Sequence, residues 1–183
     1  TSTPCTINPI LYAPISPRLT CQPTGLVSIA VTKMEHDMNI KDRYIIDVGA
    51  HDGKDSLYYS SRGFKVVAFE ANPVIADDIR KLATANSLDI DVRNLAVAEE
   101  SGVMDFYVNH PNTTWSSLDE SLGTRNGAYE TLSVPTGRLD EQLAAIDGEI
   151  HYVKIDIEGF DDVALTQILM LDQRPRFISV ENG

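Results

Sequence analysis

From residue 43 onward, short apolar segments alternate with segments whose apolar residues have helical spacing. The apolar segments "YIIDVGA", "KVVAFEA" and "HYVKIDIEG" are typical of strands that are buried on both faces of a sheet. Strands that alternate with helices form parallel sheets, because right-handed crossovers return the chain to the same edge. We therefore predict an α/β fold with a Rossmann-like, mostly parallel sheet and helices on both faces. The predicted strands cover residues 44–50, 65–71, 89–98, 151–159 and 174–182, and the predicted helices cover 55–63, 72–87 and 161–171.

Within the second predicted helix, Pro73 occupies the first turn, where proline is favoured. The helical spacing places four apolar side chains on one face, which we expect to be the buried face. These side chains are Val74, Ile75, Ile79 and Leu82.

Two segments interrupt the strand and helix alternation. Residues 103–108 ("VMDFYV") and 131–136 ("TLSVPT") alternate apolar and polar side chains, and a long polar stretch separates them. This pattern predicts an inserted antiparallel strand pair with a long loop.

The N-terminal segment has a different composition. Five prolines within residues 1–24 exclude a helix or a central strand there, and the apolar spacing that follows predicts a packing helix. We therefore divide the chain into residues 1–42, a proline-rich arm plus packing helix, and residues 43–183, a single α/β domain.

The charge balance restricts the partners of the chain. Its 27 acidic and 15 basic residues give a net charge of −12, and it lacks a dense basic block that could follow a phosphate backbone, so we expect no nucleic-acid partner. No apolar run approaches the roughly 20 residues of a membrane span. A cytoplasmic location is favoured, but Cys5 and Cys21 leave an oxidising compartment open if they pair. The oligomeric state stays open.

The first predicted strand ends in a glycine turn, "DVGAHDG". Ligands of parallel α/β sheets bind beyond the carboxyl ends of the strands, and Gly49 and Gly53 allow close backbone approach. The carboxylates of Asp47, Asp52 and Asp55 would repel the pyrophosphate of a dinucleotide but attract a ligand with an amine and a sulfonium.

A further carboxylate, Glu70, ends the second predicted strand in "VVAFEANP". A carboxylate at this place can accept hydrogen bonds from both ribose hydroxyls of an adenosine. The glycine spacing also differs from the G-x-G-x-x-G of nicotinamide enzymes. We therefore predict S-adenosylmethionine as the cofactor.

Seven segments in this order, "DVGAHDGKDSL", "VVAFEANP", "NLAVAEESGVMDFYV", "SSL", "VPTGRLDEQL", "VKIDIEGFDDVAL" and "RPRFISVEN", resemble the FkbM-type methyltransferases of the class I superfamily. The resemblance covers residues 43–181 and implies O-methylation of a hydroxyl on a sugar, glycan or secondary metabolite. It also implies cofactor-binding roles for Asp47, Gly49, Ala50, Gly53, Ser56, Glu70, Ala71, Asn94 and Leu95, with the adenine beside the last two.

The sequence departs from the family pattern at three positions and at its end. His51 stands where Asn is usual, Ala71 where Pro often follows the acidic residue, and Asp161 where Glu is usual. A class I sheet normally continues into a helix and an antiparallel hairpin, whereas this chain stops at Gly183. We therefore expect the C-terminal hairpin to be missing and favour an incomplete chain.

The segment "KIDIEG" supplies the candidate catalytic residues. Lys154 and Asp156 point to one face of the predicted strand, and Glu158 follows at its carboxyl end. Charges inside an apolar strand need a partner or a site. Asp156 and Glu158 are therefore candidates for acceptor orientation or proton removal, and Lys154 is either a third catalytic residue or a structural ion-pair partner.

Asp156, Glu181 and Asn182 resemble by position the magnesium ligands of catechol-type methyltransferases, but the FkbM type is not generally read as metal-dependent, so we predict no metal. His51 could serve as a base, although a solvent-facing position is the simpler interpretation. Trp115 could line an acceptor pocket or anchor its own loop.

Two functions fit these observations. The first is an active O-methyltransferase on a small-molecule or glycan acceptor, and the second is a non-catalytic methyltransferase-like module for binding or assembly. The intact glycine turn with Glu70 favours the enzyme, because a module without catalysis would not need to keep a cofactor site.

Overall fold

The computed structural model describes residues 40–181. The predicted arm and packing helix therefore lie outside the described residues, apart from a short 3-10 turn, η1, at Ile40–Asp42. The remaining elements follow in chain order: β1 (Arg43–Val48), α1 (Lys54–Ser61), β2 (Lys65–Phe69), α2 (Pro73–Ala85), β3 (Ile90–Arg93), β4 (Ala96–Val97), β5 (Gly102–Asn109), η2 (Thr113–Trp115), α3 (Glu120–Gly123), β6 (Tyr129–Gly137), α4 (Leu139–Leu143), β7 (Glu149–Ile155), α5 (Asp161–Leu169) and β8 (Phe177–Val180).

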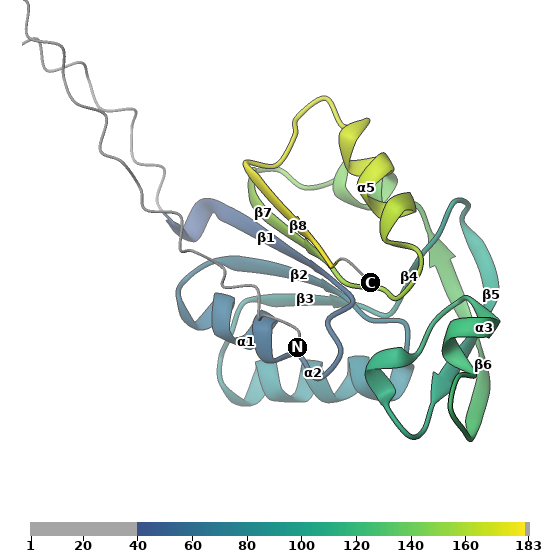
Figure 1. Cartoon of the computed structure of the whole chain (residues 1–183). Helices are drawn as coiled ribbons and strands as arrows, with labels where there is room; N and C mark the ends of the chain where they lie inside the picture. Colours follow the sequence, from purple (N-terminus) through teal and green to yellow (C-terminus); the bar gives the residue numbers. More distant parts are fainter. Residues whose placement is uncertain (1–39, 182–183) are drawn as a thin grey trace, which may run out of the picture. The chain divides into compact units, whose positions relative to one another are not determined.

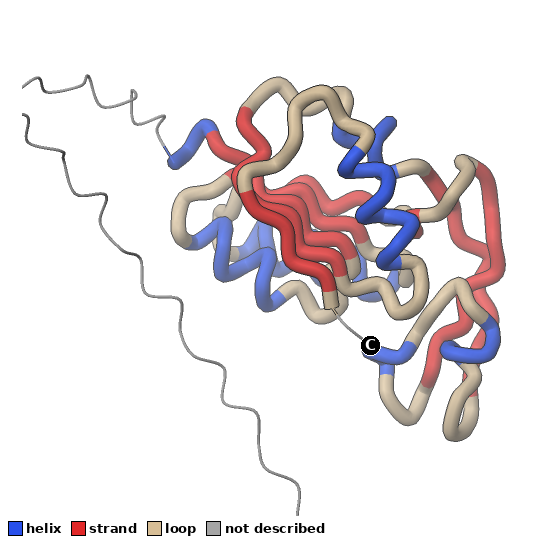
Figure 2. The backbone as a smooth tube through the Cα atoms, turned by 45° about the horizontal axis from the view of Figure 1, so that its top comes forward, coloured by secondary structure: helices blue, strands red, loops and turns tan. Residues whose placement is uncertain are grey.

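Five strands form one parallel sheet in the order β3-β2-β1-β7-β8 (Figure 1, Figure 2). The chain adds β2 and β3 on one side of β1, then returns to add β7 and β8 on the other side. The strand order therefore reverses between β1 and β7, where parallel α/β sheets bind their ligands. The predicted mostly parallel α/β sheet is confirmed.

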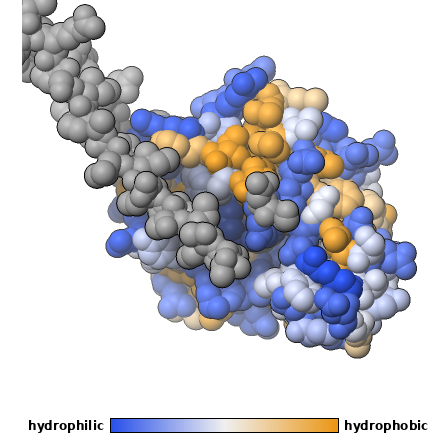
Figure 3. Space-filling model, in the orientation of Figure 1, coloured by the Kyte–Doolittle hydropathy of each residue, from blue (hydrophilic) through white to orange (hydrophobic). Residues whose placement is uncertain are grey.

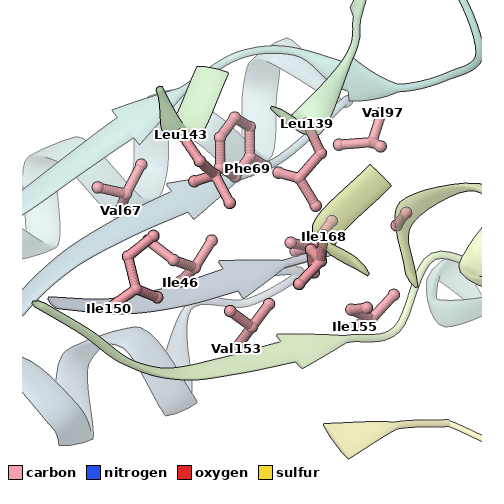
Figure 4. Packing of buried hydrophobic residues seen from close by; sticks show 12 residues of the cluster. Ile46, Val67, Phe69, Val97, Leu139, Leu143, Ile150, Val153, Ile155 and Ile168 are labelled. Carbon is pink, nitrogen blue, oxygen red and sulfur yellow. The ribbon is translucent and has the colours of Figure 1, made fainter. Parts of the chain in front are cut away.

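Helices cover both faces of this sheet and bury a core on each. On one face, Ile46 and Val153 of neighbouring strands pack with Leu139 of α4 and Ile168 of α5 (Figure 4). On the other face, β1, β2 and β3 pack against α2 around Ile79. Because both cores are closely packed, the loops at the carboxyl edge of the sheet start from fixed positions.

Helix α2 buries only part of the face that the apolar spacing predicts. Pro73 is its first residue and Ile79 is buried, as expected, but Val74 is 67% and Leu82 43% exposed. The helix meets the sheet through Ala76, Ile79 and Ala83. The short side chains of the two alanines allow the helix to approach the sheet closely. Ile75 also packs against this core, so two of the four large apolar residues lie on the buried side and two do not.

The predicted third strand, residues 89–98, is two strands in two sheets. Strand β3 pairs with β2 in the large sheet, whereas β4 joins a small sheet of order β4-β6-β5. The chain leaves the large sheet at residues 94 and 95, which separate the two strands. In the small sheet, β5 and β6 form the predicted antiparallel pair. We call residues 110–128, between these two strands, the insert.

The surface of the described residues is mostly polar, as the net charge suggests. Apolar surface gathers over β8 and the end of α5 (Figure 3), where Leu169, Met170, Phe177 and Val180 are exposed. In the part of the chain that the structure describes, we find no helix that is both long and apolar enough to cross a membrane.

Candidate functional site

A cavity of about 320 Å³ lies at the carboxyl edge of the sheet, beside the reversal between β1 and β7. The loops after β1, β2 and β7 form most of its wall, and the insert adds Thr113, Thr114, Ser116 and Leu118. Pockets for small molecules typically measure roughly 300–1,000 Å³. The cavity is therefore of the size expected for a small-molecule ligand.

The glycine turn brings its backbone against the end of β7. Gly49 has a φ of +86°, and a Cβ at this position would lie 1.9 Å from the backbone oxygen of Asp156. Only glycine combines this φ with such close approach. Gly49 and Ala50 line the cavity, whereas Gly53 lies behind the turn, where a Cβ would come within 2.9 Å of the Ile79 side chain.

Asp47 is fully buried beneath this turn rather than exposed in the cavity. Ser56 Oγ donates to Asp47 Oδ2 at 2.6 Å, and Lys154 Nζ lies 3.7 Å from Asp47 Oδ1. The same Nζ lies 3.0 Å from Asp55 and 3.6 Å from Asp156. Asp47 and Ser56 therefore shape the turn, and Lys154 is the counter-ion that three carboxylates share.

The pKa values of this cluster reflect burial and pairing. Burial raises the pKa of Asp47, while the ammonium of Lys154 and the hydroxyl of Ser56 oppose the rise. Burial also disfavours the charged form of Lys154, but the surrounding carboxylates outweigh it and raise the pKa of this lysine. Lys154 is therefore charged and cannot act as a base.

Glu70 follows β2 and presents a buried carboxylate to the cavity. Its Oε2 accepts a hydrogen bond from the His51 N–H and its Oε1 one from the Asn72 N–H, each at 2.8 Å. Burial raises the pKa of Glu70 to about 7, although these two N–H groups oppose the rise. A carboxylate has about four lone-pair positions, so each oxygen retains one for a hydroxyl group in the cavity.

The residues around Glu70 separate into wall and support. Ala71 and Leu95 line the cavity. Asn94 does not, because its Nδ2 donates to the backbone oxygens of Glu70 and Ala71 at 2.9 and 2.8 Å. The sequence places Asn94 and Leu95 together beside the adenine, whereas the structure brings only Leu95 to the cavity and uses Asn94 to fix the loop after β2.

Asp156 and Glu158 both line the cavity at the end of β7. The carboxylate of Glu158 accepts a 2.8 Å hydrogen bond from Arg125 Nη2, and the Arg125 guanidinium lies 4.6 Å from the centre of the Trp115 ring. Trp115 thus packs within the insert and is not part of the cavity wall. The side chain of Asp156 is 35% exposed, so Asp156 is open to a ligand while Glu158 is held by the insert.

The structure also brings the insert against the glycine turn. His51 is half-buried and lines the cavity, and its Nε2 lies 2.9 Å from Thr113 Oγ1. His51 is thus a partly exposed residue of the cavity wall whose ring contacts the insert. Thr113 and Thr114 escape sequence reasoning because they lie in a polar stretch without periodicity, and only the nearby "SSL" segment of the family resemblance points to this part of the insert.

The carboxylates near β8 interact with each other. A hydrogen bond with Asp156 raises the pKa of Glu181 to about 7. Within residues 40–181, no group of three or more His, Cys, Asp or Glu side chains could hold a metal ion. Asn182, the remaining residue of the magnesium set considered from the sequence, lies outside the described residues.

The fold and the cavity define a Rossmann-like α/β protein with a candidate ligand cavity beside a glycine turn. The model of the family described as "Methyltransferase FkbM domain" matches residues 47–183 of this chain. The chain therefore belongs to the FkbM methyltransferase family, as the resemblance of its segments implies. Family membership supports methyl transfer in general.

Two further comparisons add little to this result. No curated protein sequence matches the chain. Among solved structures, the chain is similar to WbdD, whose crystal structure is at 2.2 Å, with 18% identity and a TM-score of 0.36 over 68% of this chain and 19% of that chain. This chain thus spans about a fifth of the WbdD chain, and a similarity at this level supports no statement about function.

Proposed function

We propose that the protein is an S-adenosylmethionine-dependent O-methyltransferase that acts on a hydroxyl of an uncharged sugar, glycan or secondary metabolite. The observation that carries this proposal is the Glu70 carboxylate. It follows β2, faces the cavity beside the glycine turn, and keeps a free lone pair on each oxygen. Two adjacent ribose hydroxyls can donate to such a carboxylate together.

The surroundings of Glu70 fit the other parts of the cofactor. The backbone of Gly49 and Ala50 allows close approach of the amino-acid end, Leu95 offers an apolar wall to the adenine, and the wall carboxylates favour a cationic sulfonium. When bound, S-adenosylmethionine supplies an activated methyl group. Ala71 adds to the wall beside Glu70. Four residues support this site by holding its turns or its backbone in place: Asp47, Gly53, Ser56 and Asn94.

Asp156 has the position expected of the residue that orients the acceptor. Methylation of a hydroxyl requires the acceptor oxygen to be held in line and its proton to be removed. We assign that proton to the carboxylate of Asp156, which lines the cavity and lies 3.6 Å from Lys154 Nζ. Lys154 is then a positioning residue whose ammonium group lies beside the Asp156 carboxylate, and Glu158 holds the insert through Arg125.

The charges of the wall favour an uncharged acceptor. Five wall residues carry carboxylates: Asp52, Asp55, Glu70, Asp156 and Glu158. The wall lysines, Lys54 and Lys154, are both engaged in ion pairs with wall carboxylates, at 2.5 and 3.0 Å. An acceptor that carries a phosphate or a carboxylate would meet a net negative field.

Calorimetric titration of the purified chain with S-adenosylmethionine and with S-adenosylhomocysteine tests the cofactor. We expect both to bind, and Glu70→Ala to abolish binding. Glu100→Ala is the matched control, because Glu100 is an exposed glutamate that is not part of the wall. If the folded wild-type chain binds neither compound, the proposal is wrong and the non-catalytic module is favoured.

A second measurement tests the acceptor class. Neutral methyl glycosides and the matching uronic acids are offered in parallel, and formation of S-adenosylhomocysteine is followed. Turnover with a uronic acid but not with its neutral partner would contradict an uncharged acceptor.

A further inference from the structure

We propose that His51 is a positioning residue that couples occupation of the cofactor site to the position of the insert over the cavity. The inference rests on the proposed function, because it takes the Glu70 side of the cavity as the cofactor site. His51 contacts both parts of the molecule. Its backbone N–H donates to Glu70 Oε2 at 2.8 Å, and its ring Nε2 lies 2.9 Å from Thr113 Oγ1 in the insert.

The backbone of His51 is held in an unusual conformation. Its φ of +46° lies in the left-handed region, which residues with a Cβ adopt infrequently. This conformation is found between Gly49 and Gly53, which also have positive φ. Asparagine tolerates the left-handed region as well, so the turn does not by itself require an imidazole. The imidazole ring is instead needed for the contact with Thr113, because it is long enough to place Nε2 2.9 Å from Thr113 Oγ1.

The insert is attached to the opposite side of the cavity as well. Ser117 Oγ donates to the backbone oxygen of Glu158 at 2.6 Å, and Arg125 Nη2 donates to the Glu158 carboxylate at 2.8 Å. The insert therefore spans from the end of β7 to the glycine turn. The contact between His51 and Thr113 holds it on the cofactor side.

This arrangement links the cofactor to the insert. With the insert in place, Thr113 and Thr114 form part of the wall, so a ligand in the cavity can touch them only in this arrangement. A ligand favours the state with which it makes more contacts, and the coupling is reciprocal. Occupation of the cofactor site should therefore hold the insert in place and complete the wall before the acceptor binds.

Trp115 offers a direct reporter of the insert. It is the single tryptophan of the chain and belongs to η2 together with Thr113. We would measure acrylamide quenching of its fluorescence during titration with S-adenosylhomocysteine, in parallel with calorimetry. In the wild-type chain, the ligand should reduce quenching, with the same midpoint as the calorimetric binding curve.

Variants of the pair separate its role from a general structural one. His51→Ala should bind S-adenosylhomocysteine about 2- to 10-fold more weakly, the range of one neutral hydrogen bond, and binding should no longer protect Trp115. His51→Asn keeps a residue that tolerates the turn but is too short for this contact, so it should behave like His51→Ala. Thr113→Val should reproduce the same loss, and the double variant His51→Ala/Thr113→Val should lose little more.

The remaining outcomes distinguish this inference from the proposed function. If the ligand binds but protects Trp115 equally in the wild-type and His51→Ala chains, the coupling through His51 is wrong and the proposed function stands. Losses that add fully in the double variant would likewise overturn the coupling, because the two residues would act independently. A folded wild-type chain that binds no S-adenosylhomocysteine overturns both proposals.

Discussion

Lys154 Nζ lies 3.7 Å from the carboxylate of Asp47 and 3.0 Å from that of Asp55, so one ammonium group joins β7, β1 and α1. The side chain of Asp47 is fully buried, and a buried carboxylate is stable in its charged form only beside a counter-ion. Lys154 and Asp55 also line the cavity. The ion cluster therefore connects the stability of the sheet to the geometry of the ligand site.

Lys154→Met should lower the free energy of unfolding by about 3 kcal/mol at neutral pH, because it leaves Asp47 buried without its counter-ion. The loss should shrink at lower pH, where Asp47 takes up a proton. Urea denaturation measures both effects. Lys81→Met is the matched control, since its 2.7 Å pair with Asp78 is exposed to solvent and should contribute little to stability. Equal losses in the two variants would contradict the prediction.

Gly49→Ala should destabilise the protein by more than about 2 kcal/mol. The left-handed backbone alone costs a residue with a Cβ about 1–2 kcal/mol, and the new Cβ would overlap the Asp156 backbone oxygen. Thermal unfolding followed by circular dichroism provides the measurement. Gly102→Ala serves as the control, because a Cβ there would meet only Thr136 Oγ1 at 3.8 Å. A Gly49→Ala chain as stable as the Gly102→Ala chain would show that the turn can relax.

Affinity for S-adenosylhomocysteine should increase with pH up to about pH 8. Burial raises the pKa of Glu70 to about 7, and this carboxyl group must be ionised to accept hydrogen bonds from two hydroxyls. Below its pKa, proton loss opposes binding, and the affinity should change up to about tenfold per pH unit. Calorimetry over this pH range measures the slope.

Two variants assign this pH dependence. Glu70→Gln should bind weakly and without the slope, because glutamine has no proton to lose. Glu181 also has a pKa raised to about 7, but Glu181→Gln should retain the slope if Glu70 is its origin. If the slope disappears in Glu181→Gln and persists in Glu70→Gln, the titrating group is Glu181, and the prediction for Glu70 is wrong.

Arg125→Ala should loosen the insert without affecting the sheet. It removes the hydrogen bond to Glu158 and the stacking on Trp115, so amide hydrogens of residues 113–117 should exchange about tenfold faster. Mass spectrometry of hydrogen exchange detects this, with β1 and β7 as internal references. Arg138→Ala is a control outside the insert and should leave these amides unchanged. Unchanged exchange in Arg125→Ala would mean that other contacts hold the insert.

The strands of the sheet were predictable because their sequence pattern is local. "YIIDVGA" and "HYVKIDIEG" are apolar runs that end in glycine turns. A strand that is buried on both faces needs apolar side chains on both, so its sequence is a nearly continuous apolar run. The helical period of residues 72–87 was also correct, but only Ile75 and Ile79 of the predicted face pack into the core, whereas Val74 and Leu82 are exposed. Which face of a helix is buried depends on the distance to its neighbour, and α2 lies close to the sheet through Ala76 and Ala83.

The candidate site shows the same division. The positions of Gly49 and Glu70 at the cavity follow from their places directly after strands, because the carboxyl ends of parallel strands meet at one edge. The contact of His51 with Thr113 spans 62 residues along the chain, and no local pattern signals it. The role of Asn94 could not be predicted from the sequence either, because its side chain donates to the backbone oxygens of Glu70 and Ala71 after β2.

The sequence by itself determined the α/β architecture, the glycine turn and the family, since these depend on residue spacing along short segments. Only the tertiary structure decided that Lys154 pairs with Asp47, that Arg125 holds Glu158, and that the insert reaches His51. These contacts join residues that are distant in the chain, and their partners are selected by packing rather than by local preference. The wall of the cavity is therefore a product of the fold as a whole.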